Sequence, residues 1–175
     1  ITFPFINLGA AFGAAVGIGA STSISVKLGQ RDYKTAENIL GNTITLNLII
    51  GSSFGIICLI FLDPILRFFG ASDATIPYAR SFMEVILAGN VISHMYFGMN
   101  AVLRAASKPR QAMTATIFTV LMNIVLDFIF IRLWGWGIRG AAFATVLSQA
   151  LALCWQMKQF TNKDEILHLK RGIYR

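Results

Sequence analysis

The chain has 175 residues, of which 55% are hydrophobic and only 13% are charged. A soluble domain carries about 25% charged residues and buries only about 70% of its chain surface at this size, so it could not hide so much apolar surface. The composition therefore argues against a soluble enzyme, and the formal net charge of +7 does not by itself indicate a nucleic-acid-binding protein.

Long uncharged stretches alternate with clusters of charged residues along the chain. A helix that crosses the hydrocarbon core of a membrane needs roughly 20 largely apolar residues. The stretches and their flanks predict five membrane-spanning helices, at about 3–26, 37–62, 77–103, 110–132 and 138–159, followed by a polar cytoplasmic segment at 160–175. A soluble bundle of five buried helices is the alternative, but it would leave no amphipathic helix to face water.

The positions of Lys and Arg predict the orientation of these spans. If alternate loops share a side, one side holds 11 of the 15 basic residues, and the positive-inside rule places that side in the cytoplasm. The larger group is Lys27, Arg31, Lys34, Arg104, Lys108, Arg110, Lys158, Lys163, Lys170, Arg171 and Arg175, and the smaller group is Arg67, Arg80, Arg132 and Arg139. The same orientation puts the Trp-Gly-Trp-Gly turn at 134–137 outside, where two Trp fit an interfacial aromatic belt.

Small residues in the first span predict close helix packing. Gly9, Gly13 and Gly17 are spaced by four, which places them on one helical face. The two cysteines, Cys58 and Cys154, lie in apolar spans and are interpreted as small buried hydrophobic residues, because no metal–thiolate spacing surrounds them. The chain begins with Ile and lacks a signal-peptide charge pattern, so we expect a fragment of a longer, transporter-sized protein.

The fourth span contains an ionisable residue at membrane depth, which is a functional hypothesis by default because such a group costs several kcal/mol there. Asp127 follows Asn123 by one helical turn, and both share a face with Thr116. Together the carboxylate and the amide offer oxygen ligands to one cation. The alternative is a carboxylate near the interface that pairs with Arg132 or Arg139.

The neighbouring spans carry further polar residues near the predicted depth of Asp127. Thr145 and Gln149 lie one turn apart on the fifth span, and Asn90 of the third span is placed at a similar depth. A carboxylate, an amide and a hydroxyl at one depth would form an oxygen cage for a hard cation. The alternative for Thr145 and Gln149 is a hydrogen-bonded contact between helices.

Two ionisable residues of the third span have alternative interpretations. His94 could relay protons or could be a hydrogen-bonded contact between helices. Glu84 could pair with Arg80 at the spacing i,i+4 near the interface.

Four stretches in register give the sequence a resemblance to the multidrug and toxic compound extrusion (MATE) family of cation-coupled antiporters. They are GASTSISVKLG at 19–29, NAVLR at 100–104 with KPRQAM at 108–113, NIVLD at 123–127, and WGIRGAAFAT at 136–145. The resemblance covers nearly the whole chain. It implies an all-α polytopic membrane bundle, in which the chain forms a single membrane domain with helices two to six of a six-helix amino-terminal lobe.

The resemblance also implies roles for individual residues. In the family, residues matching Asn123, Asp127 and Thr145 help to bind the coupling H⁺ or Na⁺, and Na⁺ would bind at Asp127 and Asn123. Residues matching Asn100 and Gln149 line the substrate cavity, and Thr116 is added because it shares the face of Asn123. The motif assigns a position in the substrate cavity to Asn100. The predicted depth in the membrane, close to that of Asp127, favours Asn90 for this position instead. The acidic partner expected on the first helix of the lobe is absent from this sequence.

The implied function is a secondary active multidrug efflux transporter of a bacterial cytoplasmic (inner) membrane. It would export cationic, amphipathic drugs in exchange for H⁺ or Na⁺. It would lie in membrane lipid and would need no cofactor and no nucleic-acid partner. It would also need the missing first helix and the second lobe of the same chain. One alternative is a flippase of lipid-linked oligosaccharides from the same superfamily, which would have a more basic cavity. A non-transporting membrane scaffold and a membrane enzyme subunit are further alternatives, but no nucleophile–base or metal constellation supports an enzyme.

Overall fold

The structure is a computed structural model that describes residues 2–161. Within these residues it contains helices and turns and no β-strand. The elements are α1 (Thr2–Gly29), α2 (Tyr33–Ile60), α3 (Leu62–Phe68), α4 (Ile76–Ala88), α5 (Asn90–Ala105), α6 (Pro109–Asp127), the π-helix η1 (Phe128–Leu133) and α7 (Gly137–Thr161). The expected all-α fold is confirmed, whereas the expected cytoplasmic segment lies, from residue 162 on, outside the described residues.

Most of the described helices have the length and composition of membrane spans. Helices α1, α2 and α7, and α6 continued by η1, are each long and apolar enough to cross a membrane, and the bent pair of α4 and α5 meets the same criterion if it counts as one span. The third expected span is therefore broken, with an angle of 56° between its halves. The break falls at Gly89, where a Cβ atom would overlap the side chain of Val146 on α7. The missing side chain lets α7 pack into the bend.

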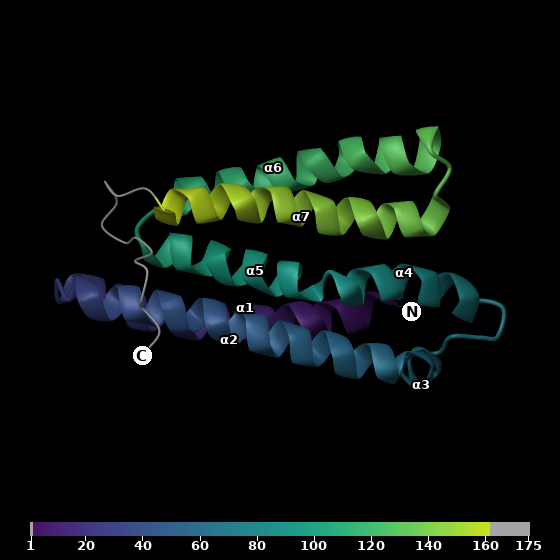
Figure 1. Cartoon of the computed structure of the whole chain (residues 1–175), viewed down its shortest axis with the longest axis horizontal. Coiled ribbons are helices and arrows are strands. Elements are labelled where there is room, and N and C mark those ends of the chain that lie inside the picture. Colours follow the sequence, from purple (N-terminus) through teal and green to yellow (C-terminus); the bar gives the residue numbers. More distant parts are fainter. Residues whose placement is uncertain (1, 162–175) are drawn as a thin grey trace.

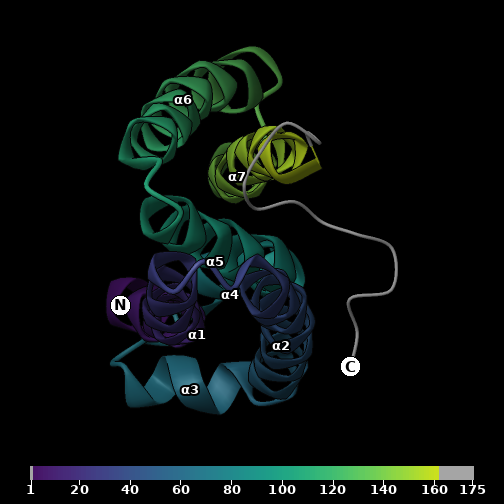
Figure 2. The same cartoon turned by 90° about the vertical axis from the view of Figure 1, so that its left-hand side faces the viewer.

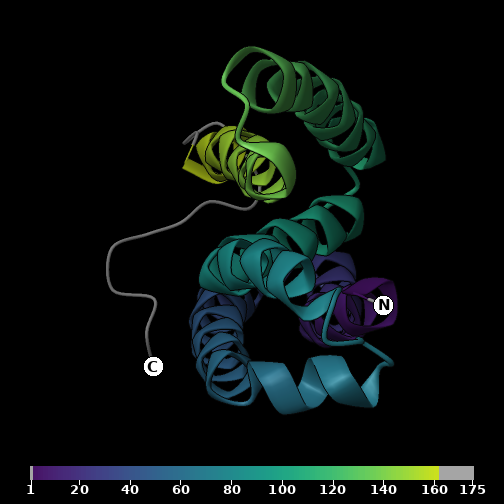
Figure 3. The same ribbon diagram turned by 90° about the vertical axis from the view of Figure 1, so that its right-hand side faces the viewer.

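The long helices lie roughly parallel or antiparallel to one another, and α6 and α7 form a pair beside α5 (Figure 1). Helices α1 and α2 cover the other side of α5, as the view along the bundle shows (Figure 2). The short α3 runs across the bundle, roughly perpendicular to the long helices (Figure 3). The α1–α2 turn, the α5–α6 turn and the end of α7 lie together at the left end of Figure 1. The described members of the larger basic group are therefore gathered at one end.

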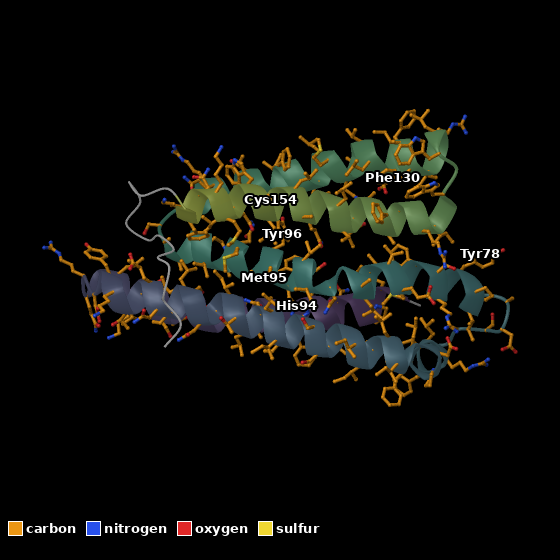
Figure 4. All side chains as sticks on the ribbon, in the orientation of Figure 1. Tyr78, His94, Met95, Tyr96, Phe130 and Cys154 are labelled. Carbon is orange, nitrogen blue, oxygen red and sulfur yellow. The ribbon has the colours of Figure 1, made fainter. Side chains whose placement is uncertain are left out.

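The turn between η1 and α7 at the opposite end is built by glycine and aromatic residues. Gly135 and Gly137 have φ angles of 67° and 56°, a left-handed conformation that glycine adopts without steric cost. Trp134 and Trp136, on either side of Gly135, pack on Phe130, with ring centroids 5.2 Å and 5.4 Å from it. Figure 4 labels Phe130 at this end of the bundle. The predicted Trp turn is thus an aromatic cluster that joins the ends of two spans.

The glycine face predicted for the first span contacts α5. A Cβ atom at Gly17 would lie 2.8 Å from the Cα of Gly98, and one at Gly13 would lie 3.1 Å from the ring of His94. Lipid provides little hydrophobic drive for helix association, so membrane helices gain stability from close packing of this kind. The small-residue interpretation of Gly13 and Gly17 is confirmed.

Candidate functional site

The site begins with a hydrogen bond between α6 and α7. The Asn123 amide donates to the hydroxyl oxygen of Thr145 over 3.4 Å, and the Thr145 hydroxyl donates to the Ala141 carbonyl over 3.1 Å. Because the antiparallel pair places these residues opposite one another, two side chains separated by 22 positions meet. This contact uses the amide nitrogen of Asn123.

Asp127 ends α6 one turn beyond Asn123. Its Oδ1 atom is buried and has no hydrogen-bond partner within residues 2–161. The π-helix η1 starts at the next residue, and π-helical segments, whose hydrogen bonds run from i to i+5, occur frequently at functional sites. A carboxylate removed from water is stabilised when a proton or a cation neutralises it.

The basic residues considered as interfacial partners of Asp127 do not pair with it. Arg139 instead contacts Glu84, with 3.4 Å between Nη2 and Oε2. Glu84 also accepts from Nε of Arg80 at 2.9 Å, as the i,i+4 spacing predicts, and Arg80 reaches Asp63 at 2.9 Å. These exposed pairs join α3, α4 and α7 at the end of the bundle that holds the Trp turn.

A cavity of about 160 Å³ lies beside the Asn123–Thr145 pair. Helices α1, α2, α4, α5 and α7 all contribute to its lining. Its polar residues are Asn7, Asn90, Ser93, His94, Thr145 and Gln149. Thr145 thus belongs both to the cavity and to the contact with Asn123.

Hydrogen bonds fix part of this lining. The Ser93 hydroxyl and Oε1 of Gln149 are 2.5 Å apart, which joins α5 to α7. The Asn90 amide donates to the Gly51 carbonyl over 2.9 Å, which joins α5 to α2. Three residues singled out in the sequence, Asn90, Thr145 and Gln149, therefore share one cavity.

Asn100 and Thr116 occupy a different place, near the α5–α6 turn. The Asn100 amide donates to the Ala112 carbonyl over 3.1 Å and to the Thr116 hydroxyl over 3.2 Å. Its oxygen accepts from a guanidinium nitrogen of Arg104. Asn100 thus braces α5 against α6, and neither Asn100 nor Thr116 is part of the cavity lining beside Thr145.

Sequence reasoning did not assign Ser93, Asn7 or His94 to the site. Ser93 and Gln149 are 56 positions apart, and no periodicity in either span indicates that they meet. His94 could be recognised only as an ionisable residue within a span.

The three side chains that the sequence singled out for cation binding, Asp127, Asn123 and Thr145, all offer oxygen atoms. They are a carboxylate, an amide oxygen and a hydroxyl, the oxygen ligands typical of alkali and alkaline-earth ions. Residues 2–161 contain no group of three or more His, Cys, Asp or Glu that could hold a metal ion.

Comparison with known proteins identifies relatives over most of the chain. The family model described as MatE matches residues 1–129. "Multidrug export protein MepA" of Staphylococcus haemolyticus is 30% identical over 167 residues, which are 95% of this chain and 37% of that protein. The protein of the same name in Staphylococcus saprophyticus is 25% identical over 175 residues, which are 100% of this chain and 39% of that protein.

Solved structures give the same result. The inward-facing conformation of a multidrug resistance MATE family transporter of the MOP superfamily superposes with a TM-score of 0.94 at 30% identity, covering 99% of this chain and 40% of that one. The outward-facing conformation of such a transporter gives a TM-score of 0.90 at 31% identity, covering 99% and 39%. The chain thus spans about two fifths of the length of these relatives, and it belongs to the MatE family of integral membrane proteins.

Proposed function

We propose that this chain is the ion-coupling part of a secondary active efflux transporter, which exports cationic, amphipathic drugs in exchange for H⁺ or Na⁺ across the bacterial cytoplasmic membrane. The observation that carries the proposal is the buried and unpartnered oxygen of Asp127, one turn from Asn123. The multidrug export names of the relatives support the direction and the class of substrate.

The proposed exchange of drug for cation depends on neutralising the negative charge of the Asp127 carboxylate. When a proton or Na⁺ binds at Asp127, with Asn123 and Thr145 as further oxygen ligands, the negative charge that attracts a cationic drug is removed. The two ligands then favour different arrangements of the helices, and transport alternates between them. Asn90 and Gln149, in the cavity beside Thr145, are proposed to contact the drug, and Asn100 with Thr116 to border its path.

The direct test is the Asp127→Asn variant of the full-length protein in proteoliposomes. We expect it to insert normally and to lose drug efflux driven by an imposed proton or sodium gradient. The neutral amide cannot take up and release a proton, and it has no negative charge to attract Na⁺. Gradients of H⁺ and Na⁺ imposed separately on the wild-type protein identify the coupling ion. Efflux of a fluorescent cationic dye is the measurement.

A matched control is Asp73→Asn, which removes an acid paired with Arg67 on the surface, where 87% of the Asp73 side chain is exposed. We expect wild-type efflux from this control. Wild-type gradient-driven efflux by Asp127→Asn would contradict the proposed function.

A further inference from the structure

His94 presents a buried side chain without a visible partner. It is 1% exposed at the middle of the bundle (Figure 4), and neither Nδ1 nor Nε2 has a hydrogen-bond partner within residues 2–161. A buried polar atom without a partner destabilises the folded state, because it has lost its hydrogen bonds to water. Two ring nitrogens without hydrogen bonds, even to water, would therefore lower the stability of the folded protein.

The surrounding helices leave space for this ring. A Cβ atom at Gly13 of α1 would lie 3.1 Å from its Cγ and Nδ1 atoms, and one at Gly51 of α2 would lie 3.3 Å from its Cβ. The ring of Phe54 on α2 is a further neighbour, with 6.1 Å between ring centroids. Glycines on two helices thus make room for a polar ring. An apolar side chain in the same place would stabilise the fold more, since it would bury no polar atom without a partner.

The cavity beside His94 can supply the missing partners. Its volume is about 160 Å³, whereas one water molecule needs roughly 10–15 Å³ of such space and two to four polar partners. Asn7, Asn90, Ser93, Thr145 and Gln149 provide those partners around the same space. Water in this cavity would satisfy the imidazole and make it accessible to protons.

We propose that His94 is a proton-binding site, that it exchanges protons with water held in this cavity, and that it is linked to Asp127 through Thr145 and Asn123. The proposal rests on the proposed function and adds a second ionisable group to it. The link is physical: Thr145 lines the cavity and accepts from Asn123, which lies one turn from Asp127.

The electrostatics of the cavity favour coupling between the two groups. Among the described residues that line it, from α1, α2, α4, α5 and α7, His94 alone is ionisable. No lining carboxylate neutralises a proton on the imidazole, so the charge state of Asp127 influences that proton more strongly. A negative Asp127 favours protonated His94, and a neutralised Asp127 disfavours it. Histidine suits this role because its charge ordinarily changes between about pH 5 and 8.

The first test is a titration of the full-length protein labelled with ¹⁵N-histidine. The signal of His94 is assigned as the one that the His94→Gln variant loses. Between pH 5 and 8.5 we expect this signal to report protonation, with a midpoint that moves to lower pH in Asp127→Asn. An imidazole that keeps one protonation state over the whole range overturns the proposal, and so does a midpoint that Asp127→Asn leaves unchanged.

The second test is transport in proteoliposomes. We expect His94→Gln to lose efflux driven by a proton gradient and to reduce the pH dependence of drug binding, because glutamine can form hydrogen bonds with water in the cavity but cannot take up a proton. The control is Met95→Leu, which alters a buried neighbour on α5 outside the cavity lining and should preserve both. If His94→Gln does not fold, His94→Asn takes its place, both for assigning the signal in the titration and for the transport measurement.

The two hypotheses fail differently. Coupled efflux by Asp127→Asn would refute the proposed function whatever His94 does. Loss of efflux in Asp127→Asn, together with an imidazole that does not titrate, would refute only the role of His94.

Discussion

Asp32 shows how one side chain sets a helix start and responds to pH. Its Oδ1 atom accepts the backbone N–H of Thr35 over 3.2 Å and so caps α2, and Lys27 lies 3.9 Å from its Oδ2 atom. The pKa of Asp32 is lowered from its usual value by hydrogen bonds from the side chain and the backbone of Thr35, and further by Lys27 and Lys34. The folded protein therefore favours the ionised form.

The pH dependence of this cap can be predicted with its sign. Because the folded pKa is lowered, the charge of Asp32 contributes stability above its unfolded pKa of about 3.9, and the contribution is lost as pH falls through the lower folded value. Asp32→Asn keeps a capping oxygen without the charge. We expect wild-type stability to exceed that of the variant at pH 6 and the difference to shrink towards pH 3, as measured by thermal unfolding in detergent. A difference that stays constant over this range would show that the charge contributes nothing.

Polar residues in the spans could be found in the sequence, but their partners could not. The hydroxyls of Thr43, Thr45 and Thr119 donate to the carbonyl four residues earlier in their own helix. The amides of Asn90 and Asn123 instead reach another helix. A hydropathy pattern does not distinguish a polar residue that bonds within its own helix from one that bonds to another helix. The partner depends on tertiary packing, which the pattern does not contain. The proposed roles of Asp127, Asn123 and Thr145 remain predictions.

At the scale of the helix, small residues decide how closely two spans approach. Gly17 of α1 faces the backbone of Gly98 on α5, whereas a Cβ atom at Gly19 would meet nothing within 4 Å. The two glycines lie two residues apart on one helix and differ chiefly in what they face. They form a matched pair for testing whether close packing holds α1 against α5.

We expect Gly17→Ala to destabilise the protein by about 1–3 kcal/mol, because the added methyl must push the two backbones apart. Gly19→Ala should be neutral or stabilising by up to about 1 kcal/mol, since alanine has the better helix propensity. Thermal unfolding of both variants in detergent measures the difference. Equal stabilities would show that α1 and α5 can separate without cost.

The helix pattern predicted the α1 contact better than the α4–α5 bend. Residues spaced by four share a helical face, so the sequence alone predicts close packing at Gly9, Gly13 and Gly17. A single glycine such as Gly89 carries no comparable signal, because the residue that fills its space, Val146, lies 57 positions away in the chain. A break of this kind is visible only when the neighbouring helix is in place.

For the whole molecule, composition and charge clustering were sufficient to predict the fold class. They indicated an all-α membrane bundle before any contact was known, and the helices of the structure and the family confirm that fold class. The packing of α1 and α2 on one side of α5, and of α6 and α7 on the other, did not follow from sequence, since every span is apolar on most faces. Side-chain size and shape decide that arrangement.

The two ends of the bundle differ in charge, and this difference predicts the orientation. One end holds seven described basic residues of the larger group, at the α1–α2 turn, the α5–α6 turn and the end of α7. The other end holds the ion pairs of Arg80 with Asp63 and Glu84, where the acids offset the positive charge. The positive-inside rule counts Lys and Arg near span ends, so the first end should face the cytoplasm.

Single cysteines introduced into a cysteine-free form of the full-length protein test this orientation in intact bacterial cells. Ser72→Cys, in the exposed α3–α4 connection, should react with a membrane-impermeant maleimide from outside. Gln30→Cys, in the exposed α1–α2 turn, should react only after the membrane is permeabilised, since it lies at the basic end. Both positions are exposed, so a difference in labelling reports the side of the membrane and not burial. Labelling of Gln30→Cys alone in intact cells would reverse the orientation, and with it the side from which the coupling ion reaches Asp127.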